Sequence, residues 1–461
     1  MKKTAFVLSI ASLALQQFTC CGCSIPVPGI SVYKPEKCDN GYTLLTSLGA
    51  HENPPSSGIY HGAILIDMDG TLINEWAIAG MPAKMLPDGH VMGYDAYRDD
   101  GTGHLECNAL VLQDWHGNEV WRWDQWDLDA HGNPIARGHH DFQREGNPVG
   151  YPVPGMNSLV HSGKTLILVH ENVVRPDIAP WTIEDDVVLE VDYEGNILWE
   201  WHASDHSRAF GFNWAARIAL QTVQVGAPEL LGGGADVTDW LHINSASYLG
   251  PNQWWDDGDT RFHPENIIVD ARSANIIWII EKATGDIVWK VGPDYARWRP
   301  EGKLGQIIGQ HHAHLIPKGL PGEGNILVFD NGGGAGFGWL LGTPTYPNKY
   351  RFYSRVIEFN PITLDIVWEY KRQEPASEEY YMFYSFYISS AQRLLNGNTL
   401  ITEGSTGRVF EVTPTGELVW EYVSLYHDLA FDMLPALLRF ENDVYRAYRI
   451  PYDQVPIESL Q

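Results

Sequence analysis

Basic residues are scarce in this sequence, where 31 Lys and Arg stand against 58 Asp and Glu and give a formal net charge of −27. Such a chain repels the phosphates of nucleic acids and of anionic membrane surfaces, so neither is an expected partner. An anionic substrate would have to be attracted by a local basic group. Each Arg or His that the fold brings to a shared position is therefore informative.

Cysteine is scarce too, with five in 461 residues. Three of them, in the segment 20–23, follow two lysines and an apolar run in residues 1–18. That run is too short to span a bilayer as a helix and is typical of a secretory signal. We therefore assign residues 1–23 to a signal and expect an exported protein, periplasmic or at the cell surface, which would carry a lipid anchor if Cys23 is acylated.

Cys38 and Cys107 are the remaining cysteines. An exported protein folds in an oxidising compartment, where disulfides form and persist. A Cys38–Cys107 disulfide is therefore one expectation, although the sequence does not fix the distance between the two residues.

The sequence leaves little room for helices, because one short unit recurs along nearly all of it. Its clearest copy, residues 390–422, reads as three strands separated by turns at residues 396–397 and 414–416. Three strands in so few residues must run up, down and up.

The closing strand of this unit has two apolar residues, then Trp, a polar residue and an aromatic. It recurs as LINEW (72–76), EVWRW (119–123), ILWEW (197–201), IVWKV (287–291), IVWEY (366–370) and LVWEY (418–422). The first copy has Asn74 at the Trp position, and the fourth ends in Val291. A second apolar strand precedes each copy, at residues 42–46, 90–94, 165–169, 266–270, 325–329 and 398–402.

Six copies of one strand pair are typical of radial repetition of small antiparallel sheets. We predict an all-β, six-bladed β-propeller over residues 41–424 with irregular insertions, of which residues 204–236 are expected to be partly helical. An ordinary β-sandwich is the alternative, but it does not require one aromatic signature in every hairpin. Residues 24–40 are expected to form an extended lead-in, and residues 425–461 a tail that packs on the propeller or closes the ring.

Histidines recur where successive blades begin, and the loops that enter the first strand of each blade converge on the axis of a propeller. The candidates are His139 and His140 in GHHD (138–141), His242 and Asn244 in WLHINS (240–245), His311 and His312 in GQHHAH (309–314), and Ser390 in SSAQ (389–392). The alternative interpretation is that these side chains are polar plugs of the central channel.

Arg272 follows the apolar strand at residues 266–270. The planar fork of a guanidinium matches the oxygens of an oxyanion, so Arg272 is a candidate anion clamp. The alternative is a surface Arg at the end of a strand.

Taken in order, these motifs resemble those of the bacterial arylsulfate sulfotransferases. The segments that carry the resemblance are GHHDF (138–142), WLHINS (240–245), IIVDAR (267–272), GQHHAH (309–314), NILVFDNGGG (325–334), SRVIEF (354–359) and SAQRLLNGNTLITEG (390–404). Members of that family are six-bladed periplasmic propellers that need no nucleotide sulfate donor. The resemblance covers blades 3 to 6.

The resemblance implies a ping-pong reaction in which His311 takes the sulfuryl group from a phenolic sulfate ester and a phenol then accepts it. It implies no cofactor, and its substrates are phenolic sulfates and phenols. The side chains implied around the sulfuryl group are His140, His242, Asn244 and Arg272, with Ser390 as the hydroxyl residue of the last blade and with His139 and His312 adjacent to the substrate.

The sequence departs from the family in three ways. No separate N-terminal β-domain precedes the first blade, which leaves the oligomeric state open. His312 and His314 share a motif with His311, which leaves His312 open as the nucleophile. The segment before Arg272 reads VDA, where two small residues are more usual.

The residue types fit sulfuryl transfer. Neutral imidazole, with an ordinary pKa of about 6.5, is nucleophilic at neutral pH, and a second histidine can protonate a leaving phenolate. No G-x-S-x-G motif is present for acyl transfer. Two other classes stay open: a metal-dependent lyase or hydrolase in which the histidines hold a divalent ion, and a non-catalytic binding propeller, which would not require Arg272 beside histidines.

Overall fold

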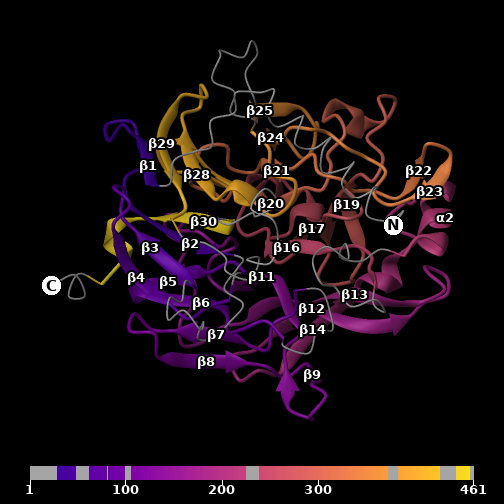
Figure 1. Ribbon diagram of the computed structural model, residues 1–461, viewed down its shortest axis with the longest axis horizontal. Helices are drawn as coiled ribbons and strands as arrows, with labels where there is room; N and C mark the ends of the chain where they lie inside the picture. Colours follow the sequence, from indigo (N-terminus) through magenta and orange to yellow (C-terminus); the bar gives the residue numbers. More distant parts are fainter. Residues whose placement is uncertain are drawn as a thin grey trace, which may run out of the picture.

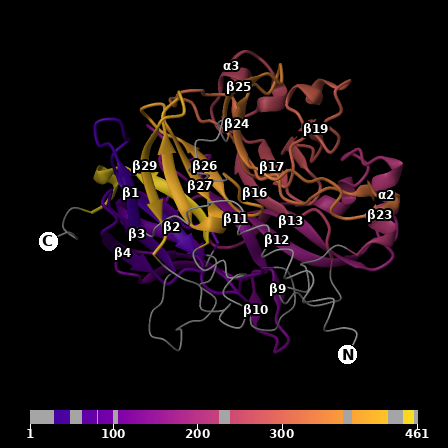
Figure 2. The ribbon, with the colours of Figure 1, turned by 45° about the horizontal axis from the view of Figure 1, so that its top comes forward.

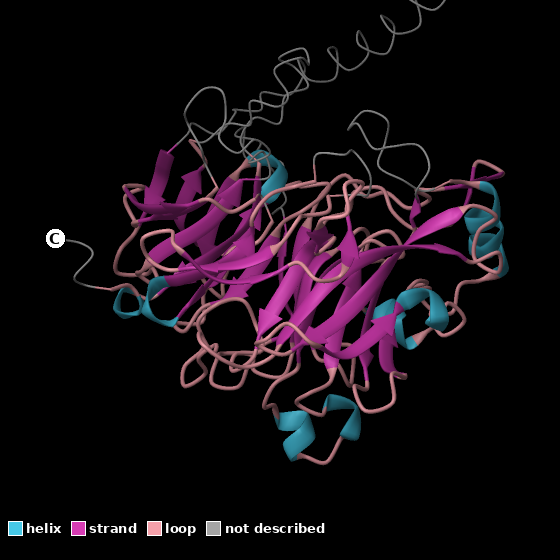
Figure 3. Cartoon of the chain, turned by 90° about the horizontal axis from the view of Figure 1, so that it is seen from below, coloured by secondary structure: helices cyan, strands magenta, loops and turns pink. Residues whose placement is uncertain are grey.

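Six antiparallel sheets are arranged around a common centre in the computed structural model of the protein (Figure 1). The structure describes residues 29–47, 62–79, 81–98, 105–224, 238–371, 383–425 and 443–456. The predicted all-β, six-bladed β-propeller is therefore confirmed. Seen from below, the strands form the body of the molecule and the short helices lie at its periphery (Figure 3).

Each blade contains four antiparallel strands that follow one another from the axis outward. They are, in blade 1, β30 (Val444–Ile450), β2 (Tyr42–Ser47), β3 (Ala63–Ile66) and β4 (Leu72–Trp76); in blade 2, β5 (Lys84–Leu86), β6 (His90–Tyr94), β7 (Leu110–Gln113) and β8 (Glu119–Trp123); in blade 3, β11 (Gly138–Arg144), β12 (Thr165–Val174), β13 (Thr182–Val191) and β14 (Ile197–His202); in blade 4, β16 (Ile243–Tyr248), β17 (Ile267–Ala271), β18 (Ile276–Ile280) and β19 (Ile287–Val291); in blade 5, β20 (His311–Leu315), β21 (Ile326–Asp330), β24 (Arg355–Phe359) and β25 (Ile366–Lys371); and in blade 6, β26 (Ser390–Arg393), β27 (Thr399–Glu403), β28 (Arg408–Val412) and β29 (Leu418–Val423). All six closing strands and all six preceding strands predicted from the repeat are present, with ends that differ by one residue in most cases and by more at β12.

The two ends of the described chain close the ring. Strand β30 pairs with β2 and is the innermost strand of blade 1, so the yellow end of the chain lies beside its indigo start (Figure 1). Of the two expectations for the tail, ring closure is therefore the one that the structure shows, and the propeller extends beyond the expected boundary at residue 424 because Val444–Ile450 is a blade strand. The lead-in likewise contains β1 (Gly29–Tyr33), which adds an outer strand to blade 6 through β29 (Figure 2).

The recurring Trp has a physical role that explains the repeat. Its indole N–H donates to a carbonyl in the outer turn of the next blade. These bonds are Trp121 Nε1 to Tyr193 O (2.7 Å), Trp289 Nε1 to Pro361 O (2.9 Å), Trp368 Nε1 to Pro414 O (2.9 Å) and Trp420 Nε1 to Met68 O (2.9 Å). In blade 1 the amide of Asn74 makes the same bond to Trp115 O (2.8 Å). In blade 3 the donor is not the recurring Trp199 but the closing aromatic Trp201, which donates to Gly285 O (2.9 Å).

The remaining elements are insertions between or within blades. The expected helical excursion contains a 3₁₀ turn (Ala203–His206) and helix α2 (Trp214–Thr222), which Asn213 caps by accepting from the Ala216 N–H (3.0 Å). The others are the hairpins β9 (Asp127–Leu128) with β10 (Pro134–Ile135) and β22 (Gly338–Leu340) with β23 (Thr343–Thr345), strand β15 (Thr238–Asp239) parallel to β13, helix α3 (Gln253–Asp256), and 3₁₀ turns at Pro87–Gly89, Thr260–Phe262, Pro300–Lys303, Gly404–Thr406 and Tyr452–Gln454. No helix in the described part of the chain is both long and apolar enough to cross a membrane.

The expected disulfide does not form. Cys38 and Cys107 are both free, because Cys38 lies against blade 6, with its thiol 3.4 Å from Val419 O, and Cys107 is buried in blade 2. The signal assigned to residues 1–23 lies outside the described residues.

We expect Trp289→Phe to lower the free energy of unfolding by about 1–3 kcal/mol, because it leaves the buried carbonyl of Pro361 without its donor. Trp368→Phe is the matched control: its bond to Pro414 O is solvent-exposed, so water can replace the indole and the loss should stay below about 1 kcal/mol. Urea denaturation of both variants measures the difference. Equal losses would show that the buried bond is not the stabilising feature.

Candidate active site

Blades 3, 4 and 5 enter their innermost strands through the same distorted backbone. His140, His242 and His312 have φ values of +53°, +57° and +58°, in the left-handed region. The register of each of these strands shifts at or beside the histidine, as in a β-bulge. A non-glycine residue held there costs about 1–3 kcal/mol, and such strain is typical of functional sites.

His311 is buried and its ring orientation is fixed. Its Nδ1 lies 2.8 Å from Asn331 Oδ1 and 3.0 Å from Gly309 O. Asn331 donates its amide hydrogens to Ser385 O (2.8 Å) and Ile388 O (2.9 Å), so its oxygen must face His311. Nδ1 of His311 is therefore the protonated nitrogen, and the lone pair lies on Nε2.

Arg272 lies beside His311. A Cβ on Gly309 would be 3.9 Å from Arg272 Cγ, and Arg272 Nη1 donates to the Tyr346 hydroxyl (3.2 Å). Burial lowers the pKa of His311 well below its ordinary value, and the charge of Arg272 lowers it further. His311 is therefore a neutral base, and the positive charge of Arg272 next to it disfavours a divalent metal ion on its ring.

His242 and His140 form the neighbouring part of the site. Their rings meet edge to face with centroids 4.5 Å apart. Nδ1 of His242 forms a hydrogen bond with the carboxylate of Asp239, and the His242 carbonyl accepts from the Arg272 N–H (2.9 Å). The carboxylate orients the ring and stabilises positive charge on it, so Nε2 of His242 can hold and release a proton.

His139 connects this group to a second cluster around His170. Its Nδ1 lies 2.9 Å from Nδ1 of His140, and its ring stacks on His170 with centroids 3.6 Å apart. Glu106 and Glu184 flank Nδ1 of His170, each at 3.4 Å. Burial alone would lower the pKa of His170, but the surrounding carboxylates raise it well above its ordinary value.

This second cluster contains two groups whose ligand atoms lie close enough for a metal ion, one formed by His139, His170 and Asp186 and one by Glu106, His170 and Glu184. The stacked rings of His139 and His170 are only 14° from parallel. Their lone pairs therefore run side by side and cannot converge on one ion without rotation. As it stands, the cluster is an imidazolium held by carboxylates.

Three other predicted site residues, Asn244, Ser390 and His312, have side chains that are held by partners outside the group of His140, His242 and His311. Asn244 donates to Gln310 O (2.8 Å) and accepts from the His312 N–H (3.3 Å), so it ties blade 4 to the backbone around His311. The Ser390 hydroxyl donates to Thr402 Oγ1 (3.0 Å) within blade 6.

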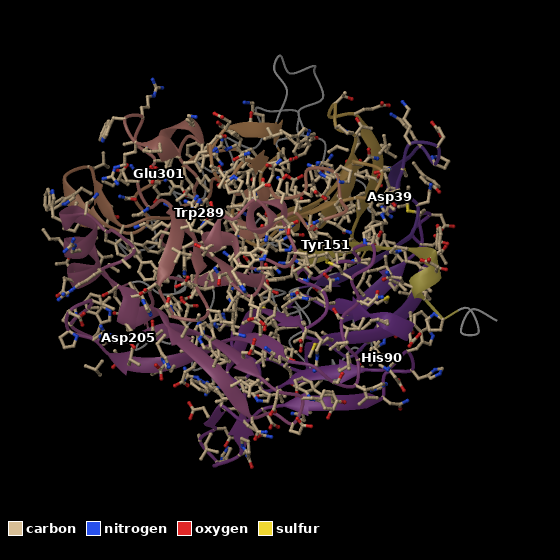
Figure 4. The ribbon with its side chains drawn as sticks, turned by 180° about the vertical axis from the view of Figure 1, so that it is seen from behind. Asp39, His90, Tyr151, Asp205, Trp289 and Glu301 are labelled. Carbon is tan, nitrogen blue, oxygen red and sulfur yellow. The ribbon has the colours of Figure 1, made fainter. Side chains whose placement is uncertain are left out.

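The third is His312, whose ring lies toward the axis with centroids 4.5 Å from His314 and 5.9 Å from Tyr448. His314 in turn lies 2.9 Å, through Nε2, from the hydroxyl of Tyr151, which is near the middle of the ring when the molecule is seen from behind (Figure 4). These contacts favour the plug interpretation for His312.

Sequence reasoning missed Asn331, Asp239 and Arg446. Asn331 occupies the place in NILVFDN that Arg272 occupies in NIIVDAR, so alignment of the repeats could have found it. Arg446 donates to Asn244 O (2.6 Å) and to Asp141 Oδ2 (2.9 Å) at the axis. The only sequence feature that could have pointed to Arg446 is its position within the otherwise largely apolar segment VYRAYRI (444–450).

The model of the arylsulfotransferase (ASST) family matches residues 157–431, which is more than half of the chain. The chain belongs to the arylsulfotransferase family. His242, Arg272, His311, Asn331 and most of blade 6 lie within the matched segment, whereas His139 and His140 precede it. No curated protein sequence matches the chain.

Several solved structures share the arrangement at low identity. A protein of unknown function from Bacteroides caccae is 11% identical over 89% of this chain and 99% of its own, with a TM-score of 0.42. Virginiamycin B lyase from Staphylococcus aureus is 12% identical over 87% and 85%, with a TM-score of 0.33, and the Dos1 propeller is 9% identical over 86% and 72%, with a TM-score of 0.34. These likenesses carry no argument about function.

The geometry predicts how the reaction responds to pH. Because the pKa of His311 lies well below its ordinary value, its lone pair should persist in acid, and the rate of phenol release from an aryl sulfate should not fall between about pH 7 and about pH 5. Rapid-mixing measurement of the first turnover tests this. A fall centred near pH 6.5 would contradict it.

Asn331→Asp should make the rate fall at low pH, a decline that we do not expect in the parent protein. A carboxylate at Nδ1 stabilises the imidazolium and raises the pKa of His311, so the lone pair on Nε2 is lost as the pH falls. The same first-turnover measurement should show a decline below neutral pH. An unchanged profile would mean that Asn331 does not set the protonation of His311.

Proposed function

We propose that this arylsulfotransferase moves a sulfuryl group from a phenolic sulfate ester to a phenolic acceptor through a sulfohistidine on His311. The observation that carries the proposal is the neutral His311 ring, held with Nδ1 protonated and Nε2 available, next to the Arg272 guanidinium. We place the reaction outside the cytoplasm, as the N-terminal segment predicts.

In the first half-reaction, the Nε2 lone pair of His311 attacks sulfur and the bond from sulfur to the aryl oxygen breaks. Arg272 donates to the sulfuryl oxygens, on which charge is concentrated, as cations do in phosphoryl transfer. The leaving aryl oxygen takes a proton from His242, which Asp239 orients. The positive charge on the sulfurylated ring is stabilised by the hydrogen bonds from Nδ1 to Asn331 and Gly309.

In the second half-reaction, the oxygen of a phenol attacks sulfur and the bond from His311 to sulfur breaks. The phenol proton passes to His242, which restores the starting state. One histidine therefore acts as acid and then as base, and no proton is gained or lost over the cycle. His140, in contact with His242, is placed to bind the same sulfuryl group.

His311→Ala should reduce turnover on the order of 10⁴-fold or more, because it removes the proposed nucleophile. His312→Ala is the matched control, since that ring lies toward the axis and the variant should still form the covalent intermediate. Intact mass after brief mixing with 4-nitrophenyl sulfate should show one added sulfuryl group in the parent and in the control. An adduct on the His311→Ala protein would overturn the assignment.

Arg272→Lys should keep the charge but lose the planar fork and slow transfer by about 10²–10³-fold. The loss should appear in kcat more than in KM, because the developing charge on the sulfuryl oxygens is greatest in the transition state. Steady-state kinetics with a series of aryl sulfates measures both constants. Unchanged kinetics would show that Arg272 is structural.

A further inference from the structure

The guanidinium of Arg272 is held at one corner. Its Nη1 donates to the Tyr346 hydroxyl (3.2 Å), whereas Nε and Nη2 have no hydrogen bond to a described residue. No carboxylate among the described residues forms an ion pair with Arg272, although the chain has 58 Asp and Glu. The side chain is half-buried and therefore within reach of a ligand from solvent.

The hydrogen bond to Tyr346 determines which part of the guanidinium stays available. Nε–H and Nη2–H form one edge, point the same way and match two oxygens of an oxyanion. Arg137 uses this edge to bind Glu106, with Nε 3.0 Å and Nη2 2.7 Å from the two carboxylate oxygens. Because Tyr346 takes up Nη1, the same edge of Arg272 is left for a bound anion.

The Tyr346 hydroxyl is itself fixed by a second bond. Its oxygen lies 2.9 Å from Ser273 Oγ. Since that oxygen accepts from Arg272, its hydrogen is available for Ser273. Ser273 is buried, and its backbone N–H donates to Leu241 O (3.0 Å), next to His242. The hydroxyl is therefore tied to the backbone that carries the candidate active site.

Aromatic packing holds the ring of Tyr346. Its centroid lies 5.3 Å from that of the buried Phe337, which meets Phe212 edge to face at 5.7 Å. Phe337 and Tyr346 flank the hairpin of β22 and β23, an insertion of blade 5, and Phe212 precedes helix α2 in the insertion between blades 3 and 4. Figure 1 shows α2 beside β22 and β23. Two insertions thus support one phenol.

The base of the hairpin is fixed to the turn that follows Arg272. The Gly336 N–H donates to Ser273 O (2.9 Å), and a Cβ on Gly336 would lie 2.6 Å from Asn275 Nδ2. On the other side of the turn, Asn275 Oδ1 accepts from the Gly309 N–H (2.8 Å), two residues before His311. The insertion and the strand of His311 are therefore held against the same turn.

We propose that Tyr346 is a positioning residue for Arg272, whose hydroxyl holds Nη1 so that the Nε and Nη2 edge faces the sulfuryl oxygens of the donor. This inference rests on the proposed sulfuryl transfer and adds the orientation of its anion clamp. A guanidinium held in advance loses less conformational freedom when the anion binds. The insertion of blade 5 thereby has a function, since it carries Tyr346 to the clamp.

A double-mutant cycle tests whether Tyr346 acts through Arg272. Tyr346→Phe keeps the ring on Phe337 and removes the hydroxyl, so kcat for 4-nitrophenyl sulfate should fall about tenfold to a hundredfold, with a smaller change in KM. In a protein that carries Arg272→Met, Tyr346→Phe should cause no further loss. Equal losses in the two backgrounds would overturn the positioning role.

Tyr350→Phe is the matched control. It removes an exposed hydroxyl from the same insertion, whose bond is to Pro347 O (3.4 Å), and should leave kcat unchanged. Circular dichroism and thermal melting verify that each variant is folded. If Tyr346→Phe does not fold, Ser273→Ala, which removes the acceptor of the Tyr346 hydrogen, enters the same cycle and is decided by the same outcomes.

Binding of inorganic sulfate, measured by calorimetry at constant ionic strength, gives a readout without turnover. Tyr346→Phe should raise the Kd roughly tenfold in the parent protein and leave the Kd of the Arg272→Met protein unchanged. No sulfate binding by the parent, or equal weakening in both backgrounds, would contradict the inference. If the parent releases no phenol from aryl sulfates, the proposed function fails, and the sulfate cycle still decides the role of Tyr346.

Discussion

One buried carboxylate, that of Asp141, ties four of the six blades together at the axis. From blade 3 it accepts from Lys84 of blade 2 (2.7 Å), from Arg446 of blade 1 (2.9 Å) and from the Ala246 N–H of blade 4 (3.4 Å). Burial alone would raise the pKa of Asp141, but the two cations hold it below its ordinary value. Replacing such a network by apolar groups can be neutral for stability, whereas removing one member costs about 3–5 kcal/mol. The Asp141 network therefore acts mainly by fixing the register of the inner strands against one another.

The candidate active site depends on that register. Arg446 continues from Asp141 to the carbonyl of Asn244, whose side chain holds the backbone on both sides of His311. The ring-closing strand of blade 1 and the backbone around His311 in blade 5 are thus joined through Asn244 of blade 4. The left-handed backbone at His140 and His242 is strained, and strain persists only where the surrounding structure fixes it. The packed axis supplies this constraint, so folding of the ring and assembly of the site are one event.

Electrostatics divides the interior into distinct parts. Next to the Arg272 guanidinium, His311 is neutral, while in the neighbouring cluster His170 is an imidazolium among carboxylates. At the end of β11, Nε and Nη2 of the buried Arg144 have no hydrogen-bond partner among the described residues. In a chain with so large an excess of acidic residues, each of these cations is present for a local reason.

The sequence by itself determined the blades, because strand alternation, turn chemistry and the position of the Trp donor are properties of about 30 consecutive residues. It also predicted His242, Arg272 and His311 as site residues, since repeats place equivalent residues at equivalent points of a ring, and their roles stay a prediction. Only the tertiary structure decided that Val444–Ile450 closes blade 1, that His311 is held by Asn331 while the ring of His312 contacts His314 and Tyr448, and that Cys38 and Cys107 lie apart. Those outcomes depend on pairings between residues far apart in the chain, and no local pattern encodes a distance between them. The surroundings of the buried Arg144 side chain and the orientation of the Asn331 amide are likewise set by neighbours from other strands.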